Sequence, residues 1–518
     1  MTIGFPTLGE LINYAFKATG IMPNKWDNTH PLSATDKKIL QKSLHRLAAE
    51  EGNINENSIA LIHQFAKILA NSIKSEKMQM VITETSRDLL EVYCSVITDD
   101  GTYLDKPESI RWVLSAYIIS RLANSINKHS IRFNVASEGF IFPDDPQWFL
   151  PTLNHDKIDW SLGKTMAWIY QLYGVSQIQF HYPGPGPKLA NTPKSNQLEN
   201  AQHWSQGKNI PSWDGLQYNF AQALDVLEQQ RPELKNTRPS IMLVLFIARL
   251  VTYIAQDIEY HYGKEFLSEL MDVFLRHSDW LKEPIKALKQ VTEKIIAESH
   301  CPPELIDSLY FMNAERFWRE AADIIIYAAR DIESILHENN NQLTAQHKDQ
   351  FTSKYGQYIT CQVIDLIERQ QHTTNKVPDG FAECLSEFFS LKQTITSPAE
   401  IFAFSNKLDS YGLAHTINWA TPWLQATLCY RNMDWPGAYA AIKIAFENAK
   451  YSAGRNQHPL VNQYLHACAK NNKWREFKKG AAWAYYLGIK VRFLDNDEPS
   501  DENVASAFEL MQQIDFAW

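Results

Sequence analysis

Arg330 and His337 lie seven positions apart, and their side chains could act together on a phosphate group. An imidazole can take or give a proton, and a guanidinium can stabilise the negative charge that develops on a phosphorane. Apolar residues recur at three- and four-residue spacing through residues 314–339, which predicts one amphipathic helix that carries both side chains. The alternative is a solvated arginine and a histidine at the helix end, where a positive charge favours the helix dipole.

The Arg330–His337 pair resembles the R-x(4–6)-H signature of HEPN ribonucleases. The resemblance implies that both side chains lie near an RNA phosphate and that the protein cleaves RNA. An arginine and a histidine two turns apart on a helix also occur by chance in many proteins. An RNA-cleaving enzyme, with Arg330 and His337 as candidate catalytic residues, therefore stands beside a protein without enzymatic activity.

Other patterns that carry catalysis do not occur in the sequence. There is no G-x-G-x-x-G, no G-x-S-x-G and no H-E-x-x-H. The segment Gly163-Lys164-Thr165 lacks the glycine that a phosphate-binding loop needs five positions earlier, because Ile158 stands there. The sequence therefore contains no complete catalytic site.

Two pairs of residues could each donate two ligands to a metal ion. Asp257 and His261 lie one helical turn apart, and so do Glu333 and His337. A metal site needs three or four ligands, and the sequence identifies no third ligand for either pair. We therefore expect structural pairs, with no metal and no cofactor.

A second group of residues has chemistry suited to nucleic acid. Amide side chains can form paired hydrogen bonds with adenine, and lysines can contact phosphates. The candidate nucleic-acid-binding residues gather around residues 188–208, and they are Lys188, Lys194, Asn196, Gln197, Asn200, Gln202 and Lys208.

The stretch that follows these amides has a pattern of turns. Trp204, Gly207, Pro211 and Ser212 form W-x-x-G-x-x-x-P-S, which resembles the end of a Cro/XRE-type helix-turn-helix domain over residues 199–224. Glycine permits the left-handed exit from a helix, and proline followed by serine starts the next helix. The resemblance implies that residues 195–204 form the recognition helix. The alternative is a structural corner whose two tryptophans lie in a core.

Length and composition limit the class of protein. The chain has 518 residues, which predicts two to four domains. Hydrophobic residues make up 45% and charged residues 21%, as in a soluble globular protein. The net charge of −9 argues against a globally basic nucleic-acid-binding protein and leaves a local basic patch open.

Neither a leader nor a membrane span is expected. The first residues lack a basic region followed by an apolar run, and the most apolar stretch, residues 241–255, is interrupted by Arg249. A buried helix that begins at Pro239-Ser240 is expected there. The cysteines are scattered, which favours reduced thiols in the cytoplasm, and they are Cys94, Cys301, Cys361, Cys384, Cys429 and Cys468.

The periodicity predicts a mainly α protein with a little β structure near the middle. Amphipathic helices are expected at residues 58–73, 109–126 and 160–174. Alternating residues predict a short hairpin at 131–142, with weaker strand candidates at 177–182 and 489–494.

Changes in composition suggest where domains meet. Prolines and glycines fill residues 182–197, and polar segments follow at 337–350 and 394–400. The predicted parts are an N-terminal helical domain (1–130), a central segment (131–235), a helical domain (236–395) and a C-terminal helical-repeat-like domain (396–518).

An internal repeat marks the C-terminal part. The segment Cys429–Trp435 (CYRNMDW) recurs thirty-nine positions later as Cys468–Trp474 (CAKNNKW), and each copy lies between two apolar helical stretches. Residues 423–489 resemble tetratricopeptide-like helical hairpins, and residues 464–489 also resemble a pentatricopeptide-type hairpin. The resemblance implies a surface that binds another protein. Two helical hairpins packed only on their own domain are the alternative.

These observations predict a cytoplasmic, multidomain helical protein with no membrane contact. The leading hypothesis is a non-catalytic regulatory protein that binds DNA or RNA through the central segment and a protein partner through the C-terminal hairpins. The alternatives are a scaffold subunit of a larger complex that does not contact nucleic acid, and the HEPN-like ribonuclease.

Overall fold

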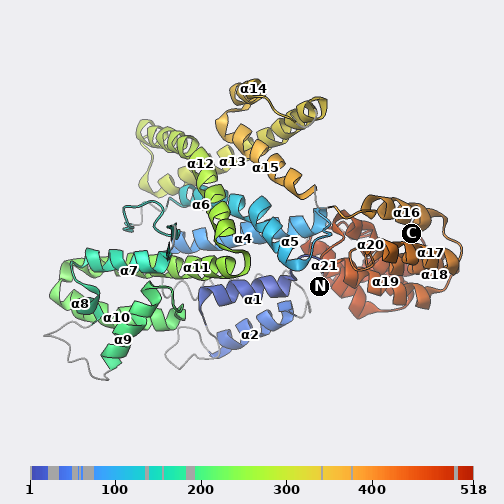
Figure 1. The fold of residues 1–518 in the computed structure, drawn as a ribbon, viewed down its shortest axis with the longest axis horizontal. Helices are drawn as coiled ribbons and strands as arrows, with labels where there is room; N and C mark the ends of the chain where they lie inside the picture. Colours follow the sequence, from blue (N-terminus) through green and yellow to red (C-terminus); the bar gives the residue numbers. More distant parts are fainter. Residues whose placement is uncertain are drawn as a thin grey trace.

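The chain is described by a computed structural model that covers residues 3–21, 34–48, 57, 60–61, 75–134, 139–154, 157–181, 193–339, 342–374, 377–494, 500–516 and 518. At residues 34, 36–37, 48, 193–197 and 370–374 it describes the backbone alone. The described chain is mainly helical and carries one small sheet, which confirms the predicted fold class (Figure 1).

Of the N-terminal helices, α4, α5 and α6 cross the middle of the molecule, and α1 and α2 lie below them in Figure 1. Asp105 caps the helix that the sequence predicts at 109–126, and a five-residue π-helix interrupts it. Its last part, α6, packs against α4, α12 and α13. The elements are α1 (Leu8–Thr19), α2 (Ala34–Ala48), α4 (Glu76–Asp99), α5 (Lys106–Val113), the π-helix η2 (Leu114–Ile118) and α6 (Ile119–Arg132). Most of the helix predicted at 58–73 lies outside the described residues.

The central segment holds the sheet and a layer of helices around α11. Its two strands are antiparallel, with Thr152 opposite Asp159 and Leu153 opposite Ile158. The elements are β1 (Thr152–Leu153), β2 (Ile158–Asp159), α7 (Ser161–Leu172), α8 (Gln177–His181), α9 (Pro193–Ser205), α10 (Trp213–Gln230), the 3₁₀-helix η4 (Pro232–Thr237) and α11 (Arg238–Tyr262).

The predicted strands are wrong in the described residues. Ile131 is buried within the last turn of α6, where the ring of Phe133 stacks on His129. Residues 177–181 form α8, which buries Phe180, and residues 489–494 contain no strand. A short run of alternating apolar residues fits either a helix or a strand. The first two segments are helical, and each buries its apolar residue, Ile131 or Phe180, on one side of the helix.

The long helices α12 to α15 project from the centre at the top of Figure 1. α13 contains residues 314–338 of the helix predicted at 314–339. α12 contains Pro284, which has no N–H to donate to the carbonyl of Trp280. The elements are α12 (Lys264–Glu298), α13 (Pro303–Glu338), α14 (Ala345–Tyr355) and α15 (Gln357–Thr374).

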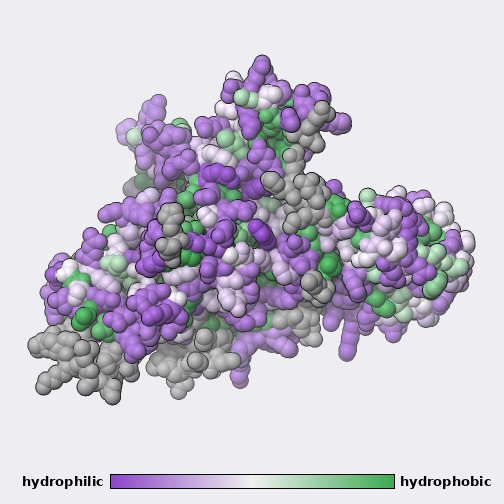
Figure 2. Space-filling view, viewed as in Figure 1, coloured by the Kyte–Doolittle hydropathy of each residue, from purple (hydrophilic) through white to green (hydrophobic). Residues whose placement is uncertain are grey.

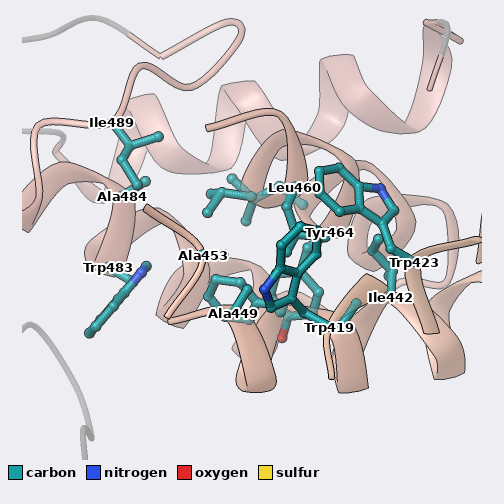
Figure 3. Packing of buried hydrophobic residues seen from close by; sticks show 14 of the residues in the cluster. Trp419, Trp423, Ile442, Ala449, Ala453, Leu460, Tyr464, Trp483, Ala484 and Ile489 are labelled. Atoms are coloured by element: carbon teal, nitrogen blue, oxygen red, sulfur yellow. The ribbon is translucent and has the colours of Figure 1, made fainter. Parts of the chain in front are cut away.

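The C-terminal helices form a separate lobe, at the right of Figure 1, in which most consecutive helices pack on one another. Buried side chains from four helices converge at its centre, among them Trp423, Ile442, Leu460 and Trp483 (Figure 3). The elements are α16 (Phe381–Thr394), α17 (Pro398–Ser410), α18 (Ala420–Arg431), α19 (Trp435–Ala449), the 3₁₀-helix η5 (Gly454–Asn456), α20 (Gln457–Lys470), α21 (Trp474–Tyr486) and α22 (Asp501–Gln513).

The internal repeat is also a repeat of backbone geometry. Met433 and Asn472, thirty-nine positions apart, are both left-handed, with φ of 59° and 54°. Each ends a helix in a Schellman turn, in which the next N–H donates to a carbonyl five residues back. These bonds run from Asp434 N to Cys429 O (2.9 Å) and from Lys473 N to Cys468 O (2.8 Å). α18–α19 and α20–α21 are therefore hairpins joined by the same turn.

Three large cores hold the molecule together. The first joins α1, α4 and α5 to the C-terminal lobe, the second joins α2 and α4 to α7–α11, and the third lies within α12–α15. Residues 1–130 therefore contribute to two cores. The face in Figure 2 is largely hydrophilic, with hydrophobic residues in small separate patches.

Backbone hydrogen bonds fasten the N-terminal part to the C-terminal lobe. The N–H of Phe5 donates to the carbonyl of Tyr451 at 2.8 Å. The N–H of Thr102, in the loop between α4 and α5, donates to the carbonyl of Ser452 at 2.9 Å. The loop after α19 is thus shared by two distant parts of the sequence.

α11 is the apolar helix that the sequence predicts as buried. The stretch Pro232–Tyr262 is long and apolar enough to cross a membrane, but 61% of its most apolar 18 residues are buried inside the fold. Arg249, 3% exposed, donates from Nε to the carbonyl of Pro211 at 2.9 Å and from Nη1 to the carbonyl of Ala18. Burial lowers the pKa of Arg249 to about 10, so it stays charged at neutral pH. This cation joins α1, α11 and the segment before α10.

A substitution at Gly163 tests how closely α7 approaches the end of α9. A methyl group on Gly163 would lie 2.4 Å from the carbonyl oxygen of Ser205. We expect Gly163→Ala to lower the free energy of unfolding by about 1–3 kcal/mol, measured by urea denaturation, although alanine usually stabilises a helix.

Gly215→Ala in α10 is the matched control. A methyl group on Gly215 would lie 3.1 Å from Ser212 Oγ, and this side chain can shift. We expect little change for this variant. A Gly163→Ala protein as stable as the wild type would contradict the close approach of the two helices.

Candidate binding surfaces

The segment between α9 and α10 is the corner that the sequence predicts. Gly207 is left-handed, with φ of 70°. Its N–H donates to the carbonyl of Trp204 at 3.1 Å, and the N–H of Lys208 donates to the carbonyl of His203 at 3.0 Å. Ser212 caps α10, because its hydroxyl accepts from the N–H of Gly215 at 3.2 Å. The helix therefore stops at a Schellman turn and restarts at a serine cap.

The corner is anchored from both sides. Trp204 and Trp213 are buried in the second core, with Leu216 and Phe220. A methyl group on Gly207 would lie 2.2 Å from the ring of Trp160, so only glycine fits there. These contacts explain the two tryptophans as packing residues.

The predicted nucleic-acid-binding residues are only partly described. Asn200 and Gln202 on α9, and Lys208 after it, are exposed. Lys194, Asn196 and Gln197 lie in α9, but their side chains are outside the described structure, and Lys188 lies outside the described residues altogether. The three described side chains are thus open to a partner.

Among the described residues, the helix before α9 is α8, and the two are not joined by a short turn. α9 packs on α7 and α8, and residues 182–192 separate it from α8. A helix-turn-helix joins its two helices by a turn of three or four residues. The likeness to that family is therefore limited to the corner and the helices on its two sides.

The two candidate catalytic residues lie on α13. Arg330 and His337 are both exposed, and His337 is in the last turn of the helix. Seven residues at about 1.5 Å each separate their Cα atoms by roughly 10 Å along the axis. Cleavage of RNA by this pair stays a prediction.

No metal site is assembled in the part of the chain that the structure describes: no three His, Cys, Asp or Glu residues are grouped so that they could hold an ion. His261 Nε2 lies 3.6 Å from Asp257 Oδ1 on the surface of α11. This pair forms a salt bridge within one helix when the histidine is protonated.

Ser125, His129 and Asp88 resemble a hydrolytic triad in composition but not in geometry. Ser125 Oγ donates to Asp88 Oδ2 at 2.6 Å, and His129 Nε2 lies 3.0 Å from the same oxygen. Burial opposes ionisation of Asp88, but the hydrogen bonds from His129 and Ser125 lower its pKa to about 2. The serine bonds to the carboxylate instead of the imidazole and is 1% exposed, so the cluster joins α4 to α6.

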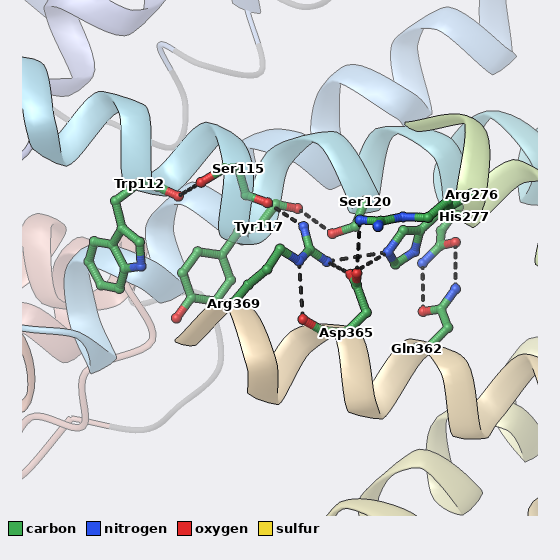
Figure 4. A network of polar contacts seen from close by, with 10 residues as sticks. Trp112, Ser115, Tyr117, Ser120, Arg276, His277, Gln362, Asp365 and Arg369 are labelled. Atoms are coloured by element: carbon green, nitrogen blue, oxygen red, sulfur yellow. Dashed lines mark hydrogen bonds and ion pairs between the residues drawn. The ribbon is translucent and has the colours of Figure 1, made fainter. Parts of the chain in front are cut away.

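A second buried network joins α12 and α15 to the π-helix (Figure 4). His277 Nε2 lies 2.8 Å from Asp365 Oδ2, and Arg369 pairs with the same carboxylate. Burial would raise the pKa of Asp365, but the hydrogen bond from His277 and the charge of Arg369 lower it. Arg369 Nη1 also donates to the carbonyl of Ser115, inside the π-helix. This cluster fixes the position of the α12–α15 arm.

A hollow of about 630 Å³ opens between α12, α13 and the junction of α14 with α15. Aromatic rings line it, together with Pro284 of α12; the rings belong to Trp280, Phe317, Tyr355 and Tyr358. None of the residues predicted from the sequence lines this hollow.

An aromatic and basic surface on the C-terminal hairpins carries a segment of the chain itself. We call residues Ile514–Trp518 the tail segment, and Ala517 within it is not described. We call the surface under it the tail-binding face; it is made of Tyr430, Trp435, His466, Lys470 and Arg492.

Ring contacts hold the tail segment on this face. Trp518 stacks on Tyr430, with ring centroids 4.8 Å apart and planes 2° apart. Phe516 stacks on His466 at 4.0 Å, and the guanidinium of Arg492 lies 4.3 Å from the Phe516 ring. Such stacked and cation–π contacts add to the burial of the rings.

Polar contacts fix the register of the tail segment. Trp518 Nε1 donates to His466 Nδ1 at 3.0 Å. Lys470 Nζ lies 2.6 Å from Asp515 Oδ1, and the hydroxyl of Tyr430 donates to the carbonyl of Phe516 at 3.0 Å. Each tail side chain from 515 to 518 that the structure describes thus has its own partner on the face.

His466 has to be neutral to accept this hydrogen bond. It is fully buried, and burial, with the charges of Lys470 and Arg492, lowers its pKa to about 4, although Asp515 opposes the shift. At neutral pH the unprotonated Nδ1 is therefore available to the indole N–H.

The tail-binding face is absent from the sequence-based predictions. His466 lies on an apolar face in YLHACAK, where a core histidine is the ordinary interpretation, and the tail follows α22 as IDFAW. The two aromatic residues directly after an amphipathic helix were the available signal. Their partners on the face lie 24 or more positions earlier, so no local pattern links them.

Comparison of this chain with known protein families, with curated proteins and with solved structures gives no match.

Acid should release the tail segment. The pKa of His466 is about 4 with the tail in place and should approach 6.5 once the imidazole is exposed to water. Between these values the open state binds more protons, so attachment is complete above pH 6.5 and weakens as the pH falls toward 4. The indole ¹⁵N–¹H resonance of Trp518, assigned by its loss in Trp518→Phe, should move toward its solvent-exposed position over this range.

His466→Gln is the control, because an amide keeps an acceptor and does not titrate near pH 5. An indole resonance that stays fixed from pH 7 to 4 in the wild type would contradict the bond to His466.

Proposed function

We propose that this chain is a non-catalytic binding protein whose C-terminal hairpins hold a protein partner. The observation that carries the proposal is the extended segment already lying across α18, α19 and α20. A surface that orders one peptide through ring stacking and an ion pair has the chemistry to order another.

The composition of the tail-binding face supports this function. Tyrosine, tryptophan and arginine are enriched where proteins bind one another, and Tyr430, Trp435 and Arg492 supply all three. The two hairpins with the same turn geometry are consistent with a tetratricopeptide-like array. The buried Ser125–Asp88–His129 cluster offers no accessible nucleophile, which favours binding over catalysis.

We further propose that the protein works in the cytoplasm. All six cysteines are free thiols in the structure, which fits a reducing compartment.

Capture of the partner tests the proposed function. The tagged full-length chain carrying Trp518→Ala, which removes one anchor of the tail segment from the face, should bring down one protein from its own cells in near-stoichiometric amount, identified by mass spectrometry. Lys470→Glu should reduce its recovery at least tenfold, because Lys470 supplies a positive charge on the face. Lys294→Glu, the same charge reversal at an exposed lysine on α12, should retain it.

Equal recovery with Lys470→Glu would overturn this function, and so would the failure of both the wild type and Trp518→Ala to capture any protein. Circular dichroism shows whether each variant keeps its helices.

Nucleic-acid binding is the second candidate function. It is favoured by one observation: Asn200, Gln202 and Lys208 are exposed along and just beyond α9. Amides on one helix can reach base edges while lysines contact phosphates. DNA and RNA are both candidates, since the described residues do not distinguish the two.

An electrophoretic shift assay with duplex and single-stranded DNA and RNA tests the second function. Binding should appear at low salt and weaken as salt rises, and Lys208→Ala should reduce the slope of log K against log salt by about one. Lys282→Ala, an exposed lysine on α12, is the matched control. No shift at low salt with any of the four nucleic acids would remove this function.

A further inference from the structure

The tail segment presents three side chains to the face in a fixed order. An acidic residue, Asp515, is followed directly by Phe516, and Trp518 comes two positions after Phe516. Ile514, which closes α22, has φ of −102° and ψ of 129°, so the chain leaves the helix in an extended conformation. An extended segment with spaced aromatic anchors is how short peptides are recognised on protein surfaces.

The tail segment does not fill the face as a core element would. Phe516 and Trp518 are half-buried, while Asp515 and Ile514 are exposed. In the second hairpin Trp474, the counterpart of Trp435, packs edge-on against Phe508 of α22 at 5.2 Å and is 36% exposed. One repeat is covered by a helix and the other by a short extended segment. A short, half-buried segment is easier for a partner to displace than a packed helix.

We propose that the tail-binding face is a receptor for a partner segment with the same order of side chains. That order is an acidic residue, an aromatic residue directly after it, and a second aromatic residue two positions further on. The tail segment occupies the face until such a segment replaces it. This inference rests on the proposed protein-binding function.

The acidic position is set by charge. Lys470 Nζ lies 2.6 Å from Asp515 Oδ1 and also donates to the carbonyl of Gln512 at 2.9 Å. It therefore contacts both the carboxylate and the backbone that precedes Asp515. Arg492 lies over the next ring, which adds a second cation beside this position. A basic residue in place of the aspartate would face two positive charges.

The last position favours an indole. A ring stacked on Tyr430 must also present a hydrogen-bond donor to His466 Nδ1, and the Trp518 N–H does this at 3.0 Å. Phenylalanine could stack there but would leave a buried acceptor unsatisfied. Among the aromatic side chains, tryptophan meets both requirements at this spacing.

The covalent link gives the tail segment an advantage over any partner. A short tether sets an effective concentration in the millimolar range, so a free peptide with the same side chains competes poorly with it. Binding in trans should therefore become visible when the tail anchors are removed.

The test uses fluorescence polarisation of the labelled, amidated peptide QIDFAW. The full-length variant Phe516→Ala/Trp518→Ala should bind it, and the wild-type chain should bind at least tenfold more weakly. Two control peptides, one with Asp515→Lys and one with Trp518→Ala, should each lose at least tenfold in affinity for the variant. Lys470→Glu in the variant background should abolish the difference between QIDFAW and the Asp515→Lys peptide.

No binding of QIDFAW to a folded double variant would overturn the inference, as would equal affinity for all three peptides. If the double variant loses its helical circular dichroism, Trp518→Ala alone takes its place. A chain that captures a protein partner but does not bind QIDFAW would keep the proposed function and contradict the proposed receptor. A chain that binds QIDFAW but captures no protein would keep the peptide-binding face and contradict the proposed function.

Discussion

The position of the tail segment on the C-terminal lobe depends on the burial of one imidazole, that of His466. His466 sits in the middle of α20, fully buried, and the rings of Phe516 and Trp518 approach it from the tail segment. A buried imidazole without a partner for its polar atoms costs free energy, and the indole N–H supplies one. The tail segment therefore stays on the hairpins because its indole N–H satisfies the buried imidazole. The same requirement makes the face selective for what lies on it.

Elsewhere, buried cations play the corresponding role by donating to backbone carbonyls. Arg249 holds the end of α1 and the segment before α10, and Arg369 holds the π-helix carbonyl of Ser115. Both guanidiniums lie where distant parts of the chain meet, and removing either would leave a buried acceptor unpaired. These two buried guanidiniums thus join distant parts of the chain.

The sequence predicted what depends on local pattern. Apolar spacing located α7, α11 and α13, and the corner at Gly207 and the repeated turn at Met433 and Asn472 followed from short motifs. The strand predictions failed because short apolar alternation fits a helix as well as a strand, and Ile131 lies in the last turn of α6. The tail-binding face could not be predicted, since stacking of Trp518 on Tyr430 joins segments that share no local signal.

A double-mutant cycle measures the hydrogen bond between Trp518 and His466 directly. The free energy of tail opening, from amide hydrogen exchange of residues 514–518, is compared in the wild type, Trp518→Phe, His466→Phe and the double variant. The structure predicts a coupling of about 0.5–1.5 kcal/mol between the two positions, as for a buried hydrogen bond. Additive effects, with no coupling between the two positions, would contradict it.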